Sequence, residues 1–270
     1  MTASESPVLG VGIGWRAEID LTVERLRTDF VEFIAEDVDP RRIPESLRLL
    51  LQRGTPALPH AVSLSLAGAE PLRTERVRHL ARVAAAVDAP LVSDHVAFTR
   101  AGEWEAGHIL PPPRTRESLD VLVDNVRRAQ DELPVPLALE HVAALVEWPG
   151  AEFGEAEFLA RLVERTGCLL IVDVANLYAN AHNLGTDPAA FLDTVPLERV
   201  AYVHVGGGVW RDGTYHDTHA HPVLPEVLEL LCELGARTRP RGVLLERDDR
   251  FPDDDELAAE LAAIRRAVAR

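Results

Sequence analysis

Eight short apolar runs recur along the chain, and each is followed by a segment in which apolar residues lie three and four positions apart. Near-continuous apolar runs are typical of parallel strands that are covered on both sides. Their alternation with amphipathic helices predicts repeated βα units joined by right-handed crossovers. The runs begin at Val8, Phe30, Leu58, Pro90, Pro136, Cys168, Val200 and Gly242.

Eight such units fit one α/β architecture in particular. The (β/α)8 TIM barrel contains eight of them in about 250 residues, and this chain has 270. No low-complexity linker or shift in composition divides the sequence. We therefore predict a single TIM-barrel domain over residues 1–270, with its functional site at the carboxyl ends of the strands.

Side chains that can bind metals stand at the ends of most of the later runs. Because the carboxyl ends of all barrel strands open on one face, residues far apart in sequence should meet there in one pocket. The candidate ligands at strand ends are His60, His95, Glu140, Asp173, His204 and Glu246, and a D-x-H motif in the loop after the seventh run adds Asp217 and His219. These are more ligands than one ion needs, which predicts a multinuclear metal centre.

The ligands divide by position into three candidate sites. They are Glu140, Asp173, His204 and Glu246 for the first ion, His60 and His95 for the second, and Asp217 and His219 with Asn176 for the third. A carboxylate such as Glu140 or Glu246 would bridge two ions at the short separation common in such clusters. We expect these two carboxylates to take part in catalysis.

Buried carboxylates give the metal prediction its physical basis. Glu140 and Asp173 lie inside otherwise apolar strands, where an unpaired carboxylate would cost roughly several kcal/mol. The chain contains no lysine to pair with them, and Arg247 should point to the opposite side of its strand from Glu246. Metal ions are the simplest counter-charge, and imidazole with carboxylate suits iron, zinc or manganese.

Composition argues against several other classes of protein. The 28 basic and 44 acidic residues give a net charge of −16, which disfavours nucleic acid or an anionic membrane as a partner. The absence of lysine excludes Schiff-base chemistry.

Cys168 and Cys232 are expected to be buried and not disulfide-bonded, which fits the reducing cytoplasm. No run is long enough to cross a membrane, and the first residues lack the pattern of a signal peptide.

Three irregular stretches follow ligand-bearing strands and are expected to form loops around the pocket. They are AGEWEAGHILPPPR from Ala101, NAHNLGTDP from Asn180 and GGVWRDGTYHDTHAHP from Gly207. Four histidines in these stretches are candidates for substrate contact or proton transfer: His108, His182, His216 and His221. Of these, His182 is our candidate catalytic residue.

Other polar residues have weaker claims on the site. His79 lies on a predicted helix and is expected on the solvated surface, and His141 should face away from Glu140 and pack in the core. Glu32 and Glu36, in and just after the second run, are expected to support the site or to pair with an arginine.

With these positions assigned, the sequence resembles the multinuclear non-heme iron-dependent oxidase family, also known as DUF692, which includes the methanobactin biosynthesis oxidase. The resemblance covers nearly the whole chain. Its motifs are LPHAVSLSL around His60, SDHVAF around His95, LEH at Glu140, DVANLYANAHNLG from Asp173, HVGGG from His204, DTHAHPV from Asp217 and LERD at Glu246.

The resemblance implies a barrel with two or three irons of mixed valence, held by the nine ligands named above. It further implies activation of dioxygen and oxidation of a ribosomally synthesised precursor peptide, typically at cysteine, often with help from a separate peptide-recognition protein. We therefore expect an iron-dependent oxidase or oxygenase, in which Glu140 and Glu246 act at the irons and loop histidines such as His182 move protons.

Four positions depart from the motifs of that family. His141 stands where an asparagine usually follows the glutamate, and Ala175 replaces the first asparagine of a pair. Leu184 interrupts an N-H-G motif, and Gly208 replaces the second histidine of H-x-A-G-H. The metal ligands are intact, so we expect these departures to affect substrate recognition or the outcome of the reaction.

Two other kinds of barrel enzyme use part of the same ligand set. Endonuclease IV, a zinc enzyme that cuts DNA, normally has a histidine at the position of Asn176, and the net charge of −16 is unsuited to DNA. A sugar isomerase or epimerase would need only the first site, which leaves His60, His95, Asp217 and His219 without a role. A third alternative is a non-catalytic barrel that keeps metal only to balance its buried carboxylates.

Overall fold

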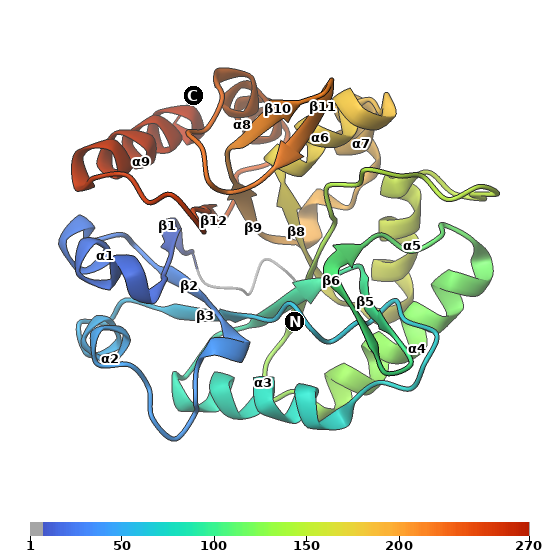
Figure 1. The fold of residues 1–270 in the computed structure, drawn as a ribbon, viewed down its shortest axis with the longest axis horizontal. Helices are drawn as coiled ribbons and strands as arrows, with labels where there is room; N and C mark the ends of the chain where they lie inside the picture. The colour runs from blue at the N-terminus through green and yellow to red at the C-terminus, as the bar shows by residue number, and fades with distance from the viewer. Residues whose placement is uncertain (1–7, 270) are drawn as a thin grey trace.

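Eight parallel strands close on themselves in the order β1-β12-β9-β8-β7-β4-β3-β2. The structure is a computed structural model that describes residues 8–269; residues 1–7 and 270 of the predicted domain lie outside the described residues. The strands are β1 (Gly10–Gly14), β2 (Val31–Ile34), β3 (Ala57–His60), β4 (Val92–His95), β7 (Leu137–Glu140), β8 (Leu169–Asp173), β9 (Val200–Val205) and β12 (Gly242–Leu245). Each overlaps one of the eight apolar runs, and the predicted TIM barrel is confirmed (Figure 1).

Helices surround this barrel as an outer layer (Figure 1). They are α1 (Asp20–Leu26), α2 (Glu45–Gln52), α3 (Thr74–Ala86), α4 (Arg116–Glu132), α5 (Glu155–Thr166), α6 (Val174–Leu184), α7 (Pro188–Thr194), α8 (Pro225–Arg237) and α9 (Asp254–Val268), with short 3-10 turns at Ala17–Ile19, Ala35–Asp37 and Leu197–Arg199. The last helix shows why they form: the Asp253 side chain caps it by accepting from Glu256 N, and Leu257, Leu261 and Ile264 make its buried face.

Side-chain alternation along the strands separates two apolar cores. One lies between strands and helices, and the other fills the barrel interior. Residues two positions apart on a strand point to the same side. A residue two positions after an interior apolar residue therefore also points into the barrel. These pairs are Phe30 and Glu32, Leu58 and His60, Ala138 and Glu140, Ile171 and Asp173, and Leu244 and Glu246. An apolar floor thus lies beneath a layer of acids and imidazoles.

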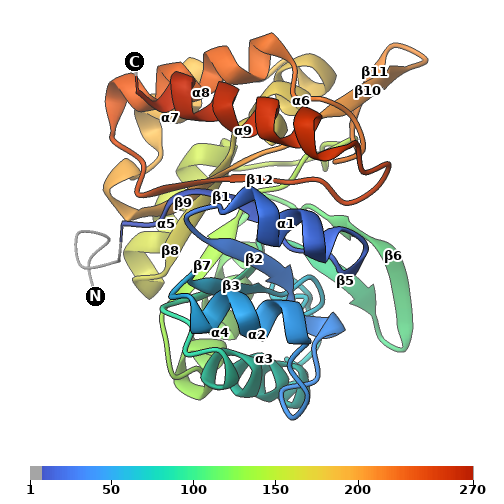
Figure 2. The same cartoon turned by 90° about the vertical axis from the view of Figure 1, so that its left-hand side faces the viewer.

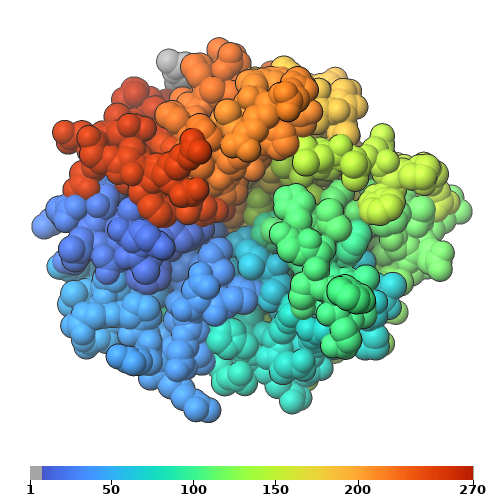
Figure 3. All heavy atoms as spheres, in the orientation of Figure 1, coloured from blue at the N-terminus to red at the C-terminus, as the bar shows by residue number. Residues whose placement is uncertain are grey.

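Two antiparallel hairpins replace stretches that the sequence predicted as loops. They are β5 (Phe98–Ala101) with β6 (Trp104–Leu110), and β10 (Gly208–Arg211) with β11 (Thr214–Asp217). Their turns use residues with positive φ, Gly102 at 58° and Gly213 at 80°, and such turns let adjacent segments pair. Both hairpins project from the same end of the barrel (Figure 2), the end that faces the viewer in Figure 3.

The loop predicted from Asn180 is also partly wrong, because its first half is helical. Residues from Asn180 to Leu184 continue α6, which ends at Gly185 with φ of 71°. A glycine in this left-handed conformation is a common helix terminator. The apolar spacing of the segment was masked by its small and polar residues, and His182 therefore lies on a helix.

Among residues 8–269, no helix is both long enough and apolar enough to cross a membrane. Cys168 is buried and Cys232 is half-buried, and neither forms a disulfide.

Candidate metal centre

The six strand-end candidates meet at the carboxyl end of the barrel. Five lie at or just after the last residue of their strands, and His204 lies one residue before the end of β9; all six point inward, above the apolar floor. Five of the six are at most 5% exposed: His60, Glu140, Asp173, His204 and Glu246. Together with the loop residues they form three groups whose ligand atoms lie within 4.8 Å of one another.

The first group joins β3, β4 and β7. Nε2 of His95 lies 3.5 Å from Oε2 of Glu140, and Nε2 of His60 lies 3.8 Å from the same oxygen. The two imidazole rings meet edge to face with centroids 4.7 Å apart. All three side chains therefore direct a lone-pair atom at one small volume.

The second group lies at the centre of the barrel and contains Glu140, Asp173, His204 and Glu246. Nδ1 of His204 lies 3.1 Å from Oε2 of Glu140 and 3.4 Å from Oε2 of Glu246. Asp173 has a second task, because its Oδ1 accepts hydrogen bonds from the backbone of Ala175 and Asn176 and caps α6. Its other oxygen remains for the centre.

The third group forms where the β10–β11 hairpin returns to the barrel. It contains Asp173, Asp217 and His219, and Nε2 of His219 lies 2.8 Å from Oδ2 of Asp217. Nδ1 of His219 lies 2.9 Å from Oδ2 of Asp248. Sequence reasoning missed Asp248, although its place two residues after Glu246 on the last strand's extension was a usable signal.

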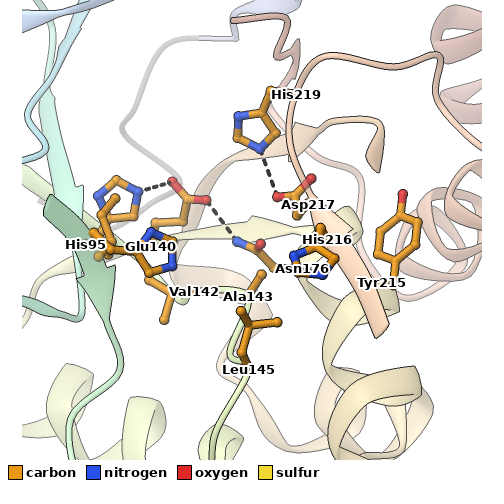
Figure 4. A pocket seen from close by; sticks show the side chains of 12 residues that line it. His95, Glu140, Val142, Ala143, Leu145, Asn176, Tyr215, His216, Asp217 and His219 are labelled. Carbon is orange, nitrogen blue, oxygen red and sulfur yellow. Dashed lines mark hydrogen bonds and ion pairs between the residues drawn. The ribbon is translucent and has the colours of Figure 1, made fainter. Parts of the chain in front are cut away.

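Asn176 borders the pocket between the second and third groups (Figure 4). Its Nδ2 donates to Oε1 of Glu140 at 3.2 Å and to the carbonyl oxygen of His141 at 2.9 Å. The amide therefore orients Glu140, and the role of Asn176 as a ligand of the third group stays a prediction.

Shared ligands make the three groups one cluster. Glu140 belongs to the first and second groups, and Asp173 belongs to the second and third. A carboxylate with two oxygens can bind two ions at once. The arrangement therefore suits two or three neighbouring cations, and it fits the predicted multinuclear centre.

Unpaired atoms show that this pocket suits cations. Among the described residues, five buried atoms of the second and third groups make no hydrogen bond of good geometry: Glu140 Oε2, Asp173 Oδ2, His204 Nδ1, Asp217 Oδ1 and Glu246 Oε2. Buried polar atoms are normally paired, since leaving one unpaired costs about 1–3 kcal/mol. Five such atoms in one place suit metal ions that prefer oxygen and nitrogen ligands.

Ionisation of the cluster reflects its crowded negative charge. Burial raises the pKa of Asp173 to about 8, and the nearby carboxylates of Asp217, Glu140 and Glu246 add to the effect. Burial opposes protonation of His204, but Glu246, Glu32 and Glu140 raise its pKa well above the usual range. Without metal, the folded protein therefore holds protons where cations would otherwise lie.

His95 behaves differently from His204. Burial lowers its pKa to about 4, against the opposing effect of Glu140. Its imidazole is therefore neutral near pH 7 and keeps a lone pair that a metal ion can take.

A cavity of about 170 Å³ opens above the ligands. Its walls come from both hairpins and from the segment after β7, and they include His108, Ile109, Val142, Leu145, Tyr215 and His216 (Figure 4). Two of the predicted loop histidines thus border the cavity. In the structure His108 lies on β6 and His216 on β11.

The other predicted histidines lie elsewhere. His182 is exposed on α6, where it stacks on Tyr178 and Trp210 with ring centroids 4.4 and 5.2 Å apart, and it does not border the cavity. His221 bonds Thr218 through Nδ1. His79 is half-buried, and its Nε2 bonds the carbonyl oxygen of Ala35. The prediction that it lies on the solvated surface is therefore wrong, because this side of the helix faces the end of β2.

Packing accounts for His141 and Arg247 as predicted. His141 is buried, accepts the backbone N–H of Asp173 and packs on Phe191. Arg247 points away from the centre and bonds Glu260 of α9 at 2.6 Å. Arg247 is therefore not the counter-charge of the cluster.

Glycines explain how the third group reaches the barrel. A Cβ on Gly207 would lie 2.0 Å from the carbonyl oxygen of His221, and one on Gly208 would lie 2.3 Å from that of His216. Only glycine allows the two ends of the hairpin to approach so closely. This approach places Asp217 and His219 beside Asp173.

Comparison with known proteins places the chain in a family. Residues 10–269 match the family described as "RiPP precursor modification enzyme MbnB/TglH/ChrH", RiPP denoting a ribosomally synthesised and post-translationally modified peptide. The chain belongs to this family. The predicted membership of the DUF692 family is thereby confirmed.

One relative of this MbnB/TglH/ChrH-family chain is a UPF0276 protein of Streptomyces avermitilis, 54% identical over 268 residues. The match covers 96% of this chain and 55% of the relative, so the chain spans about half the length of that protein.

Solved structures similar to this MbnB/TglH/ChrH-family chain share its barrel. D-allulose 3-epimerase from Methylomonas sp. superposes with a TM-score of 0.66 at 16% identity, covering 95% of this chain and 96% of that one. Endonuclease IV from Thermus thermophilus gives 0.63 at 25% identity, covering 96% and 99%. These likenesses concern the fold.

Replacing His95 tests the first ligand group of this family member. His95→Ala removes one of three ligands there and leaves the second and third groups complete, so metal content should fall by about one ion per chain while the barrel stays folded. Elemental analysis and circular dichroism after iron or zinc loading measure both. His79→Ala, outside all three groups, is the control. Unchanged metal content in His95→Ala would contradict the assignment.

The raised pKa of Asp173 predicts a pH dependence in the metal-free protein. The folded state keeps this proton up to about pH 8, whereas the ordinary value is 3.8, so the free energy of unfolding should fall as pH rises between these values. His204 and His219 act in the same direction. Thermal unfolding of the chelated protein should show Tm falling from pH 6 to pH 8, and less so in Asp173→Asn, which keeps the helix cap. Equal slopes would refute this account.

Proposed function

We propose that this chain is a multinuclear non-heme iron enzyme that uses dioxygen to oxidise a ribosomally synthesised precursor peptide at cysteine. The observation that carries the proposal is the three-group cluster, in which Glu140 and Asp173 are each shared between two groups, in a chain of the MbnB/TglH/ChrH family. A family of precursor modification enzymes supplies the substrate class, and the cluster supplies the place for the chemistry.

The chain's residues define what the centre can hold. Bound iron would supply activation of dioxygen and a coordination position for a substrate thiolate, whose pKa metal binding lowers. In this proposal Glu140 and Asp173 would each serve two ions, and the remaining ligands would be His60, His95, Asn176, His204, Asp217, His219 and Glu246. Two or three irons fit the three groups, and zinc or manganese would suit the same donors.

The cavity fits the entry of a small part of a peptide. At about 170 Å³ it has room for a side chain with its local backbone, and its walls combine ligands with apolar residues such as Ile109, Val142 and Leu145. Apolar walls with a few convergent polar groups are typical of binding sites. A single cysteine and its neighbours would enter, while the rest of the precursor stays outside.

Histidines at the cavity wall provide groups that can carry protons. His108 and His216 border the cavity from opposite hairpins. His182 lies farther out, exposed beside Trp210, and we propose that it contacts the bound peptide. A separate recognition protein would hold the remainder of the precursor, and the free thiols of Cys168 and Cys232 fit a reducing cytoplasm.

Simpler barrel functions leave part of the cluster without a role. A sugar epimerase or isomerase needs one ion, which the second group alone would hold. The first and third groups would then be superfluous, although their atoms converge as closely. The asparagine at 176 and the net charge of −16 likewise count against an endonuclease IV-like zinc phosphodiesterase.

Oxygen consumption tests the proposal. The iron-loaded chain should consume dioxygen in the presence of a short Cys-bearing peptide encoded beside its gene, together with any recognition protein encoded there, and mass spectrometry should show an oxidised peptide. Glu246→Gln should lower the rate by roughly 100-fold or more, because it removes a charged ligand.

Two controls separate the alternatives. The same peptide with serine in place of cysteine should give no uptake, and zinc-loaded protein should be inactive. Equal turnover with zinc, or turnover of sugars or abasic DNA instead of peptide, would overturn the oxidase proposal.

A further inference from the structure

A chain of hydrogen bonds runs beneath the metal centre and joins two of its histidines. Nδ1 of His60 lies 2.8 Å from Oγ of Ser93, which lies 3.0 Å from the hydroxyl of Tyr202. That hydroxyl donates to Oε2 of Glu32, and Nε2 of His204 lies 3.1 Å from the same oxygen. The Ser93–Tyr202–Glu32 bridge thus connects a ligand of the first group with a ligand of the second.

Ser93 and Tyr202 occupy strand positions two residues before a ligand, and the matching positions before other ligands are apolar. Leu58, Ala138, Ile171 and Leu244 each lie two residues before a ligand and form the floor of the barrel. Ser93 and Tyr202 hold the matching positions before His95 and His204, and both are fully buried. Polar groups in such a floor are unfavourable unless they are paired, and here they pair with each other.

Glu32 is the charged end of the bridge. It is 0% exposed, and its Oε1 makes no hydrogen bond of good geometry within the described residues. It lies on β2, two residues after Phe30 of the floor, so it points inward as the ligands do. A buried carboxylate facing a cluster of other carboxylates is unfavourable without nearby positive charge, and cations in the centre above would provide it.

The hydrogens of the bridge can be arranged in one consistent direction. A histidine that binds metal through one ring nitrogen carries its hydrogen on the other. His60 then donates from Nδ1 to Ser93, Ser93 donates to Tyr202, and Tyr202 donates to Glu32, while His204 donates from Nε2 to Glu32. The Glu32 carboxylate is the common acceptor of both arms.

The same arrangement leaves the opposite ring nitrogens facing the centre. Nε2 of His60 lies 3.8 Å from Oε2 of Glu140, and Nδ1 of His204 lies 3.1 Å from it. Both lone pairs therefore point at the oxygen shared by the first and second groups. The two histidines that the bridge joins are therefore the two that face the shared ligand Glu140.

We propose that Glu32, Tyr202 and Ser93 are positioning residues that fix the ligating nitrogens of His60 and His204 and place one negative charge beneath the two sites they serve. Through Glu32, the two sites share one acceptor. A change at one arm of the bridge weakens the ion on that arm, and loss of the carboxylate charge weakens the ions on both. The inference rests on the metal centre of the proposed function and is independent of the peptide and of dioxygen.

Glu32→Gln is the main test, because the amide oxygen still accepts hydrogen bonds but the charge is gone. Ferrous iron, titrated anaerobically against a chelator, should bind about 10–100-fold more weakly than to the wild type, as is usual for residues that support metal ligands. Metal-induced stabilisation should shrink accordingly.

Glu36→Gln is the matched control. Glu36 follows the same strand and bonds the backbone of Val62 and the hydroxyl of Ser63, and it belongs to none of the ligand groups. Its iron affinity should equal that of the wild type.

Tyr202→Phe separates the two arms. The ring keeps its edge contact with Phe30, at 6.0 Å between centroids, but the link from Ser93 to Glu32 is cut, while His204 keeps its acceptor. Iron at the His60 group should weaken by about 10-fold or more, while iron at the His204 group keeps its affinity. Mössbauer spectra of the iron-57 form should change for one component and not for the others.

Three results would overturn the inference. Wild-type iron affinity in Glu32→Gln would do so, as would an equal loss of Tm in its metal-free and iron-loaded forms, which a purely structural role predicts. A uniform change of all Mössbauer components in Tyr202→Phe would contradict the separate arms. A wild-type chain that binds neither iron nor zinc would instead refute the metal centre itself, and with it the proposed function.

Discussion

Repulsion among buried carboxylates is the constraint on which the rest of this structure depends. Glu140, Asp173 and Glu246 are at most 5% exposed and converge on His204 with ligand atoms within 4.8 Å. Two like charges at about 4 Å repel by about 4 kcal/mol at an effective dielectric constant of 20. The chain has no lysine, and Arg247 turns outward to Glu260. Cations in the pocket are the physical means by which these groups can share it as carboxylates.

The barrel makes this convergence possible through a simple alternation. Strand residues two apart face the same way, so an apolar floor residue such as Leu58 or Leu244 is followed by a ligand pointing into the same interior. The floor excludes water from below, and the hairpins β5–β6 and β10–β11 stand at the open end. A low-dielectric pocket strengthens every electrostatic interaction within it, including the repulsion among the carboxylates. Arg247 does not offset this repulsion, because it points out of the pocket toward Glu260.

Much of this was predictable from the sequence, for identifiable reasons. Apolar runs marked all eight barrel strands, and polar residues ending those runs marked the cluster, because burying Glu140 or Asp173 in such a run requires a partner. The hairpins were missed, since Gly102 and Gly213 read equally well as loop residues before their pairing is known. The bridge was missed for a different reason: Ser93 and Tyr202 are ordinary strand residues, and only three-dimensional register shows that they meet Glu32. The helical position of His182 likewise required the fold, whereas the place of Asp248 two residues after Glu246 was a signal in the sequence.

Anomalous X-ray diffraction at the iron edge, from crystals of the iron-loaded protein, tests the central claim most directly. The account predicts at least two separate iron peaks inside the barrel, one bounded by His60, His95 and Glu140 and one by Glu140, Asp173, His204 and Glu246, with a third beside Asp217 and His219 where three irons bind. A single peak at the barrel centre, or iron bound only outside these residues, would contradict it.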